Sequence, residues 1–222
     1  MEDWMIDSVI FDMDGVIFDS ERIVCDLWID FAKENNMQGM DELILKCIGI
    51  NERATEKLFL ETYGEDCPYE EYKKVIGERY RTLCGGGKLP KKTGVDELLC
   101  FLKEKGIKTA LASSTNVKTV TNQLRDAKIL EYFDVVIGGD MVTKSKPDPE
   151  IFLEAAEKLG VDPTLSYIIE DSFNGIKAAH AAGAKPLMVP DIIKPDEEIT
   201  KLCHKIFVNL HEVRAFFASI LN

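Results

Sequence analysis

A short apolar run, Val9 to Phe11, leads directly into the sequence Asp12-Met13-Asp14-Gly15. The run predicts a buried strand, because it is short and apolar and a glycine follows soon after it. In an extended chain, side chains two positions apart point the same way. The sequence therefore predicts a strand with two carboxylates at its end, where open α/β sheets bind their ligands.

Two neighbouring carboxylates leave several interpretations open. They can hold a hard cation such as Mg²⁺, attack phosphorus, or exchange a proton with a substrate. They can equally well cap or solvate a turn. An EF-hand is excluded, because the later oxygen ligands and the closing glutamate are missing at the expected spacing. The rest of the chain has to supply the partners that decide between these alternatives.

Composition narrows the class of protein. The 222 residues are 45% hydrophobic and include six cysteines with no Cys-x-x-Cys pair. This favours one core with a modest insertion, free thiols, no zinc site and a cytoplasmic location. The net charge of −12 argues against nucleic acid and anionic membranes as partners. No apolar run approaches the ~20 residues that span a bilayer.

Hydrophobic periodicity divides the chain into two kinds of segment. Residues 20–81 have helical spacing and no clear strand, and Gly85 to Gly87 follow as a joint. From Pro90 onwards, short apolar strands alternate with helices. Expected strands cover 6–11, 108–113, 135–137, 167–169, 187–189 and an edge strand at 206–208; expected helices include 41–47, 51–63, 68–83, 93–105, 116–128, 148–160, 174–182 and 210–221.

This alternation predicts an α/β fold with a doubly wound parallel sheet of Rossmann type. Right-handed crossovers bring the strand ends to one side of such a sheet. We expect a core domain formed by residues 1–18 and 86–222. We expect residues 19–85 to form an inserted helical cap domain above the strand ends, where a lid is useful.

Polar residues follow three further strands of the predicted sheet. Ser113 and Ser114 follow the second strand, Lys146 lies in the loop after the third, and Glu170 and Asp171 follow the fourth. Each group alone is explained by a turn, a solvated loop or a helix cap. Together, at one edge of the sheet, they match what a Mg²⁺-assisted phosphoryl transfer needs, because a divalent cation relieves carboxylate repulsion and neutralises phosphate charge.

These four positions resemble the four motifs of the haloacid dehalogenase-like hydrolase superfamily. The matching residues are Asp12 to Ile17, Ser113, Lys146-Pro147 and Glu170 to Gly175, and a helical cap follows the first motif. The branch that contains β-phosphoglucomutase and small sugar-phosphate phosphatases is the most similar. The motif set is specific for the superfamily and does not name a substrate.

The resemblance implies a role for each motif residue. Asp12 would attack phosphorus to form an aspartyl-phosphate, and Asp14 would act as acid and then as base. Asp12, the Asp14 backbone carbonyl and Asp171 would hold Mg²⁺, with Glu170 in or beside that shell. Ser113, Lys146 and the Ser114 backbone would bind the phosphoryl group. Because dehalogenases lack the second aspartate, Asp14 favours phosphate chemistry.

Two departures from β-phosphoglucomutase make a phosphatase the preferred interpretation. The mutase has a histidine at the start of its cap, where this chain has Val24, and its cap arginine is matched by Arg53 only with an offset of one residue. A mutase is therefore the alternative. Cap residues select the substrate in this superfamily, and the candidates here are Glu52, Arg53, Lys73 and Lys74.

The expected partner is a small phosphorylated metabolite, without nucleic acid or membrane, and the chain is expected to be a monomer or weak dimer. A non-catalytic protein, either a phosphorylation switch of the receiver-domain type or an inactive, binding-only relative, is a remote alternative. Receiver domains are shorter and carry their acceptor aspartate after the third strand, whereas the long helical segment of this chain follows the first.

Overall fold

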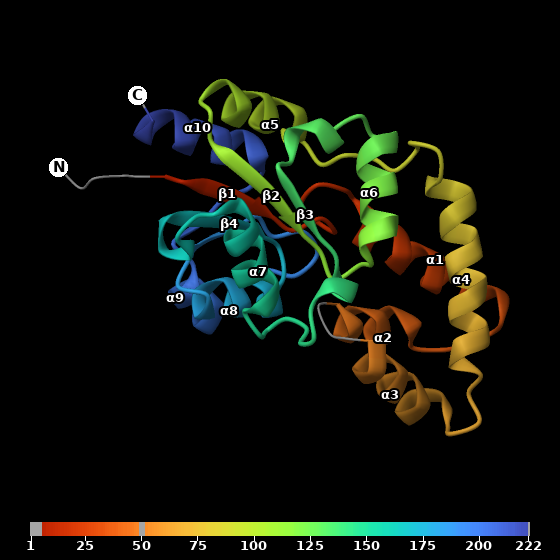
Figure 1. Cartoon of the computed structure of the whole chain (residues 1–222). Coiled ribbons are helices and arrows are strands. Elements are labelled where there is room, and N and C mark those ends of the chain that lie inside the picture. The colour runs from red at the N-terminus through yellow and green to blue at the C-terminus, as the bar shows by residue number, and fades with distance from the viewer. Residues whose placement is uncertain (1–5, 49–51, 222) are drawn as a thin grey trace.

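The computed structural model of the chain describes residues 6–48 and 52–221. One six-stranded sheet, entirely parallel, runs through this part of the chain in the order β3-β2-β1-β4-β5-β6 (Figure 1). The strands are β1 (Ser8–Phe11), β2 (Lys108–Ala112), β3 (Val135–Ile137), β4 (Ser166–Glu170), β5 (Lys185–Met188) and β6 (Lys205–Ile206). The predicted doubly wound α/β fold is confirmed.

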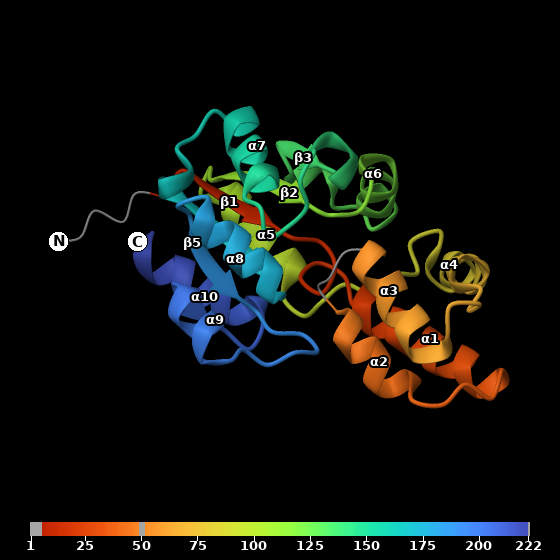
Figure 2. The ribbon, with the colours of Figure 1, turned by 90° about the horizontal axis from the view of Figure 1, so that it is seen from below.

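Helices cover both faces of this sheet. α5, α6 and α10 share a hydrophobic cluster with one face, whereas α7 and α8 pack on the other (Figures 1 and 2). The helices are α1 (Ser20–Glu34), α2 (Met40–Cys47), α3 (Glu52–Tyr63), α4 (Tyr69–Cys84), α5 (Val95–Glu104), α6 (Val117–Asp126), α7 (Glu150–Leu159), α8 (Phe173–Ala181), α9 (Glu197–Leu202) and α10 (Leu210–Ile220).

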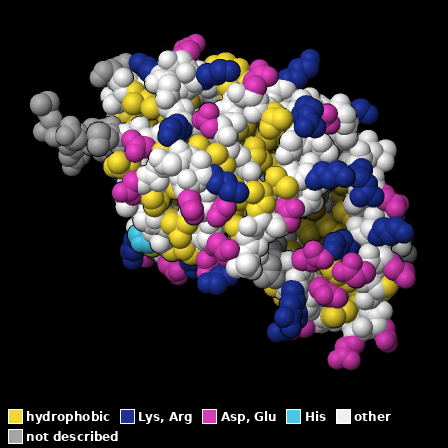
Figure 3. All heavy atoms as spheres, viewed as in Figure 1, with side chains coloured by type: hydrophobic (Ala, Val, Ile, Leu, Met, Phe, Trp, Pro, Cys, Tyr) yellow, Lys and Arg dark blue, Asp and Glu magenta, His cyan; other side chains and the backbone are white. Residues whose placement is uncertain are grey.

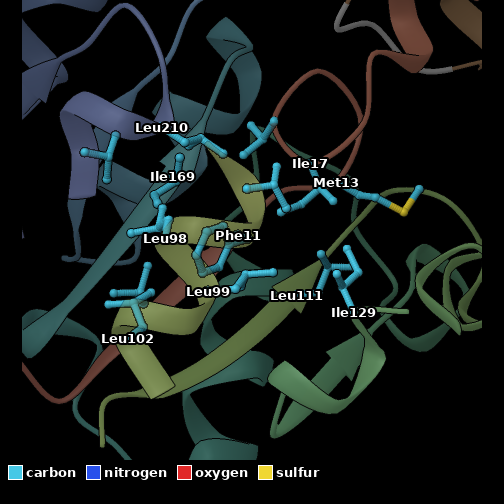
Figure 4. Close-up of a cluster of buried hydrophobic side chains, with 14 of the residues drawn as sticks. Phe11, Met13, Ile17, Leu98, Leu99, Leu102, Leu111, Ile129, Ile169 and Leu210 are labelled. Atoms are coloured by element: carbon cyan, nitrogen blue, oxygen red, sulfur yellow. The ribbon is translucent and has the colours of Figure 1, made fainter. Parts of the chain in front are cut away.

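Alternate residues of β1 face opposite layers, which explains its uninterrupted apolar sequence. Phe11 lies in the cluster that includes Leu98 and Leu99 of α5 (Figure 4), whereas Ile10 belongs to the cluster around Phe152 of α7. Both faces of the strand are therefore shielded from water, as in other parallel sheets. The strand is held at the centre of the molecule, and Asp12 follows it directly.

Helices α1 to α4 form a group beside the carboxyl ends of the strands (Figure 2). They have a hydrophobic cluster of their own, in which Trp28 of α1 contacts Phe59 of α3 and Tyr69 of α4. Because this cluster is separate from those of the sheet, we propose that residues 19–85 act as a cap domain on a core of residues 1–18 and 86–222.

The two chain segments that connect the helical group to the sheet pair with each other. Phe18 forms an antiparallel bridge with Lys91. The Asp19 amide donates to the Pro90 carbonyl at 3.0 Å, and the Lys92 amide donates to the Ile17 carbonyl at 2.9 Å. The chain thus leaves and re-enters the core at one place.

Element boundaries differ from the sequence predictions mainly at their ends. Pro68 is the N-cap of α4 rather than its first helical residue, because its ψ of 61° is not helical. The short helix α9 was not predicted, since six residues are too few to show a helical period. The expected start of α3, Asn51, lies outside the described residues. No helix in the described ranges has the length and apolar character that crossing a bilayer requires.

Candidate active site

A cavity of about 870 Å³ lies between the strand ends and the helices α1 to α4. The surface in Figure 3 is hollowed beside α1, α2 and α4, with hydrophobic side chains inside the hollow and charged ones around it. Polar residues from the strand ends line the cavity on one side and mainly apolar residues from α1 and α2 on the other. The first group includes Asp12, Asp14, Ser114, Thr115, Lys146, Glu170 and Asp171; the second includes Val24, Cys25, Trp28, Ile44 and Cys47.

Asp12 extends β1 by one hydrogen bond, since its amide donates to the Ile169 carbonyl at 3.0 Å. Its side chain pairs with Lys146, whose Nζ lies 2.5 Å from Asp12 Oδ1. The same Nζ lies 2.7 Å from Glu170 Oε1 and donates to the Ala112 carbonyl at 3.3 Å. Lys146 thereby joins the ends of β1, β2 and β4.

Burial has the largest single effect on the pKa values of Asp12 and Lys146. Loss of water raises the pKa of Asp12 well above its usual range, and the positive charge of Lys146 only partly opposes that rise. Burial alone would lower the pKa of Lys146, but the carboxylates of Asp12 and Glu170 more than compensate, so its pKa is raised overall. Lys146 is therefore a permanent cation beside the two acids.

Asp14 has a different set of partners. Gly15, with a φ of +82°, turns the chain after Asp14 and allows a close approach to Asp171. The Asp14 carboxylate accepts hydrogen bonds from Ser20 Oγ at 2.5 Å and Thr115 Oγ1 at 3.2 Å. Burial raises its pKa, and these hydrogen bonds partly offset the rise. Asp14 therefore holds a proton more readily than an exposed aspartate does.

Ser113 and Ser114 lie differently from one another. Ser113 is fully buried, accepts a hydrogen bond from the Thr115 amide at 3.1 Å and points toward Asp14 at 3.5 Å. It is not among the described residues that line the cavity, whereas Ser114 is exposed and does line it. The expected phosphate contacts of both serines stay predictions.

Glu170 is held in place by hydrogen bonds at the end of β4. Its Oε2 accepts from the backbone amides of Asp171 and Ser172, both at 2.9 Å. Ser172 is also the N-cap of α8 and accepts from the Gly175 amide. A Cβ at Gly175 would lie only 1.8 Å from Glu170 Oε1, so a glycine is required there. Ser172 therefore caps α8 and also helps to hold the Glu170 carboxylate in place.

Asp12, Glu170 and Asp171 form a group that can hold a metal ion. One carboxylate oxygen from each lies within 4.8 Å of the others, and all three residues are buried. Burial, first of all, raises the pKa of Asp171, and neighbouring acids including Glu21 raise it further. Oxygen donors in a crowded acidic site suit a hard cation such as Mg²⁺, which would remove this repulsion. The Asp14 carboxylate is not part of this group, so the expected contribution of Asp14, through its backbone carbonyl, stays a prediction.

Comparison with known proteins gives the family. Residues 9–189 match the family model described as haloacid dehalogenase-like hydrolase. The chain belongs to the haloacid dehalogenase-like hydrolases. The resemblance inferred from the four motifs is therefore confirmed, and so is the prediction of an enzyme at this level of description.

Three individual proteins illustrate this membership. A Thermotoga maritima protein named phosphorylated carbohydrates phosphatase is 35% identical over 80% of this chain and 82% of its own. A hydrolase of the family from Deinococcus radiodurans, solved with bound phosphate and sodium, superimposes with a TM-score of 0.80 at 26% identity over 98% of this chain and 97% of its own. β-Phosphoglucomutase from Clostridium difficile shares the fold, with a TM-score of 0.77 at 24% identity over 98% of both chains.

The helical group of this haloacid dehalogenase-like hydrolase places only some of the expected substrate-selecting residues at the cavity. Glu52 and Arg53 line it, as does Val24. Lys73 forms an ion pair with Glu52 and is not among the described lining residues, and neither is Lys74. Of the predicted candidates, those at the cavity therefore come from the first turn of α3 rather than from α4.

Sequence reasoning missed four residues that the site of this hydrolase uses. Ser20 and Thr115 donate to Asp14, and Glu21 lies beside Asp171. Asp191, in the loop after β5, reaches the same group of acids. Ser20 and Glu21 were detectable in principle, since they start the helix that follows the first motif. Asp191 follows the fifth strand at a distance that no local pattern marks.

Proposed function

We propose that the chain is a Mg²⁺-dependent phosphatase that hydrolyses a small phosphorylated metabolite, a sugar phosphate, through an aspartyl-phosphate. The observation that carries this proposal is the difference in surroundings between the two aspartates of the first motif. Asp12 is paired with the ammonium group of Lys146, whereas Asp14 is bonded to the hydroxyls of Ser20 and Thr115, and burial raises the pKa of both aspartates. The activity named for the Thermotoga maritima relative supports the substrate class.

Asp12 is the proposed nucleophile. Pairing with Lys146 favours its ionised form, and the strand end presents it to the cavity. Attack on phosphorus forms an acyl-phosphate on Asp12 and expels the alcohol, which splits a very slow hydrolysis into two easier steps. Lys146 lies at the right place to balance the charge of the transferring phosphoryl group.

Asp14 is the proposed acid and base. Its raised pKa, which burial causes, keeps a proton available for the departing alcohol oxygen. After donating that proton, the Asp14 carboxylate can accept one from the water that hydrolyses the acyl-phosphate. Ser20 and Thr115 fix its orientation through both steps.

Asp12, Glu170 and Asp171 are the side chains that would hold the cation, and their oxygen donor set fits one. Mg²⁺, when bound, would neutralise negative charge on the phosphate and on these acids. Glu170 also bonds to Lys146, so it orients the lysine as well as the acidic group.

A mutase must keep water from its aspartyl-phosphate until the intermediate reorients. The position of the mutase histidine is taken by Val24, which lines the cavity of this chain with an apolar side chain. The Val24 side chain can neither donate nor accept a hydrogen bond, and this favours hydrolysis over a mutase reaction.

Turnover can be tested by ³¹P NMR with Mg²⁺, β-glucose 1-phosphate, a trace of glucose 1,6-bisphosphate and a panel of other sugar phosphates. We expect inorganic phosphate to grow with time and the growth to stop when EDTA removes the cation. Glucose 6-phosphate without free phosphate would instead establish a mutase. Stoichiometric phosphorylation without turnover would establish a switch.

The variant Asp12→Asn tests the nucleophile. We expect turnover to fall by about 10⁴-fold or more, because the amide cannot form the acyl-phosphate. Asp30→Asn, which alters an exposed aspartate paired with Lys33 on α1, is the matched control and should keep full activity. Circular dichroism checks that both variants are folded. A folded Asp12→Asn protein with wild-type turnover would refute the mechanism.

A further inference from the structure

Asp191 lies in the loop after β5, and its side chain is 2% exposed. Its Oδ1 is 2.7 Å from Lys92 Nζ and 3.1 Å from Arg22 Nη2. Lys92 also approaches Asp19 Oδ1 at 3.3 Å, and Arg22 Nε lies 3.6 Å from the same oxygen. We call these four residues the Asp191 clamp.

The clamp joins three parts of the chain that are distant in sequence. Asp19 and Arg22 belong to the N-cap and first turn of α1, and Lys92 belongs to the segment by which the chain returns from the helical group. Asp191 belongs to the core. Val189, two residues earlier, continues the pairing of β5 with β4, because its amide donates to the Glu170 carbonyl. Both connections to the helical group are therefore tied to one buried carboxylate of the core.

Stability alone does not explain a carboxylate at this position. Asp191 lies within reach of Glu21 and Asp171, so it adds a third acid to a partly buried acidic group. Its second oxygen, Oδ2, is buried and has no hydrogen-bond partner among the described residues. An unsatisfied buried oxygen and like-charge neighbours both destabilise the folded state. The ion pairs of Oδ1 with Lys92 and Arg22 oppose this cost, and they hold the start of α1 in place.

Oδ1 of Asp191 holds the first turn of α1, and this turn includes Ser20. Ser20 Oγ donates to Asp14 Oδ1 at 2.5 Å, two residues before Arg22 in the same turn. Ser20 and Arg22 lie two residues apart in this helical turn, so we expect a shift of Arg22 to move Ser20 and to weaken the hydrogen bond that orients Asp14.

We propose that Asp191 is a positioning residue for the reaction: it anchors the start of α1 to the core and, through Ser20, aims Asp14 at the leaving oxygen. This inference rests on the proposed function, in which Asp14 protonates the departing alcohol. It gives a residue outside the four motifs a role in acid catalysis, namely to set the orientation of Asp14.

The proposal predicts a dependence on the leaving group. A sugar alkoxide leaves only if it is protonated, whereas p-nitrophenolate leaves without that help. In Asp191→Asn, kcat/KM for a sugar phosphate should fall by about 10- to 100-fold, and kcat/KM for p-nitrophenyl phosphate by less than about 3-fold. Loss of folded enzyme would lower both values equally. Equal loss on both substrates, or no loss on either, would overturn the proposal.

A double-mutant cycle tests whether Asp191 acts through Ser20. If it does, Asp191→Asn combined with Ser20→Ala should lose little more than the worse single variant, because both changes remove the same constraint. Losses that multiply would refute the route through Ser20. Lys92→Gln provides a second way to weaken the clamp if Asp191→Asn does not fold, and it should show the same dependence on leaving group.

The control is Glu34→Gln, which breaks an exposed ion pair with Arg79 at the other end of α1. It should leave both kcat/KM values unchanged. Amide hydrogen exchange in the first turn of α1 gives a readout that needs no turnover, and it should accelerate in Asp191→Asn but not in Glu34→Gln. An inactive wild type would refute the proposed function, whereas unchanged exchange would refute the anchoring by Asp191 separately.

Discussion

The two aspartates of the first motif lie two positions apart and have different neighbours, although burial raises the pKa of both. Lys146 contacts Asp12 and stabilises a negative charge there. Hydroxyl groups of Ser20 and Thr115 contact Asp14, and burial raises its pKa. If Asp12 is the nucleophile and Asp14 the proton carrier, as we propose, environment rather than residue type separates the two roles.

Gly15 allows a residue-scale test of the acidic site. A Cβ there would lie 2.2 Å from Asp171 Oδ2, at a φ of +82°. Gly39 has a φ of +78°, and a Cβ at that position would have no atom within 4 Å, so Gly39→Ala is the matched control for backbone strain. Gly39→Ala should lower the free energy of unfolding by about 1–2 kcal/mol, measured in urea, and Gly15→Ala should lower it by more, because its methyl group also clashes with Asp171.

Only Gly15→Ala should also lose turnover and Mg²⁺ affinity, because only its methyl group displaces Asp171. Calorimetric titration with Mg²⁺ and a phosphatase assay measure the two properties. Full activity in a folded Gly15→Ala protein would contradict the assigned place of Asp171.

Sequence predicts best those site residues that lie at a strand end or in one of the four motifs. Asp12, Lys146 and Glu170 meet because parallel strands bring their carboxyl ends together, which the alternation of strands and helices already implies. Ser20 and Asp191 join them only through the docking of α1 on the core, and that depends on tertiary packing. No local pattern encodes such a contact.

At the scale of elements, hydrophobic period identified the strands and the long helices, because burial on one or both faces sets that period. Their ends shifted by at most two residues, as at β1, which begins at Ser8 rather than at Ile6. The short helix α9 could not be predicted in this way, since capping by Asp196 rather than amphipathic spacing defines it. Caps could be predicted where a strong capping residue stands alone, as at Asn116 of α6.

The helical group has its own cluster, and this predicts partly independent stability. Phe59 is fully buried against Trp28 and Tyr69, with ring centroids 4.7 and 4.9 Å away. Phe59→Ala should destabilise α1 to α4 by about 3–5 kcal/mol. Hydrogen exchange should rise in these helices while the sheet stays protected.

Phe152→Ala is the matched control, because Phe152 of α7 is equally buried but packs against the sheet. It should raise exchange across the strands instead. Identical exchange patterns in the two variants would show that the helical group and the sheet unfold as one unit.

At the scale of the whole molecule, stability depends on pH through groups remote from the site. His204 packs edge-on against Tyr167 at 5.5 Å. Burial first, then the charges of Lys185 and Lys205, lower its pKa. The unfolded chain therefore binds a proton more readily than the native one, so stability contributed by neutral His204 is present above about pH 6.5 and is lost as pH falls toward the native pKa.

Urea midpoints measured between about pH 5 and pH 7.5 check this sign. The wild type should lose more stability than His204→Gln as the pH falls through this range, because glutamine does not titrate. Other groups affect both proteins alike, so the difference between the two curves isolates His204. Parallel curves would contradict the assigned shift.

The pairing of Phe18 with Lys91 also bears on how such enzymes diversify. Because the chain departs from the sheet and comes back at adjoining points, everything between them is an excursion whose two ends nearly touch. A shorter, longer or unrelated excursion can be exchanged there without altering the order of the strands. Most of the cavity lining that α1 to α4 supply could therefore change without altering the strand ends, whereas Ser20, at the start of the excursion, stays tied to Asp14.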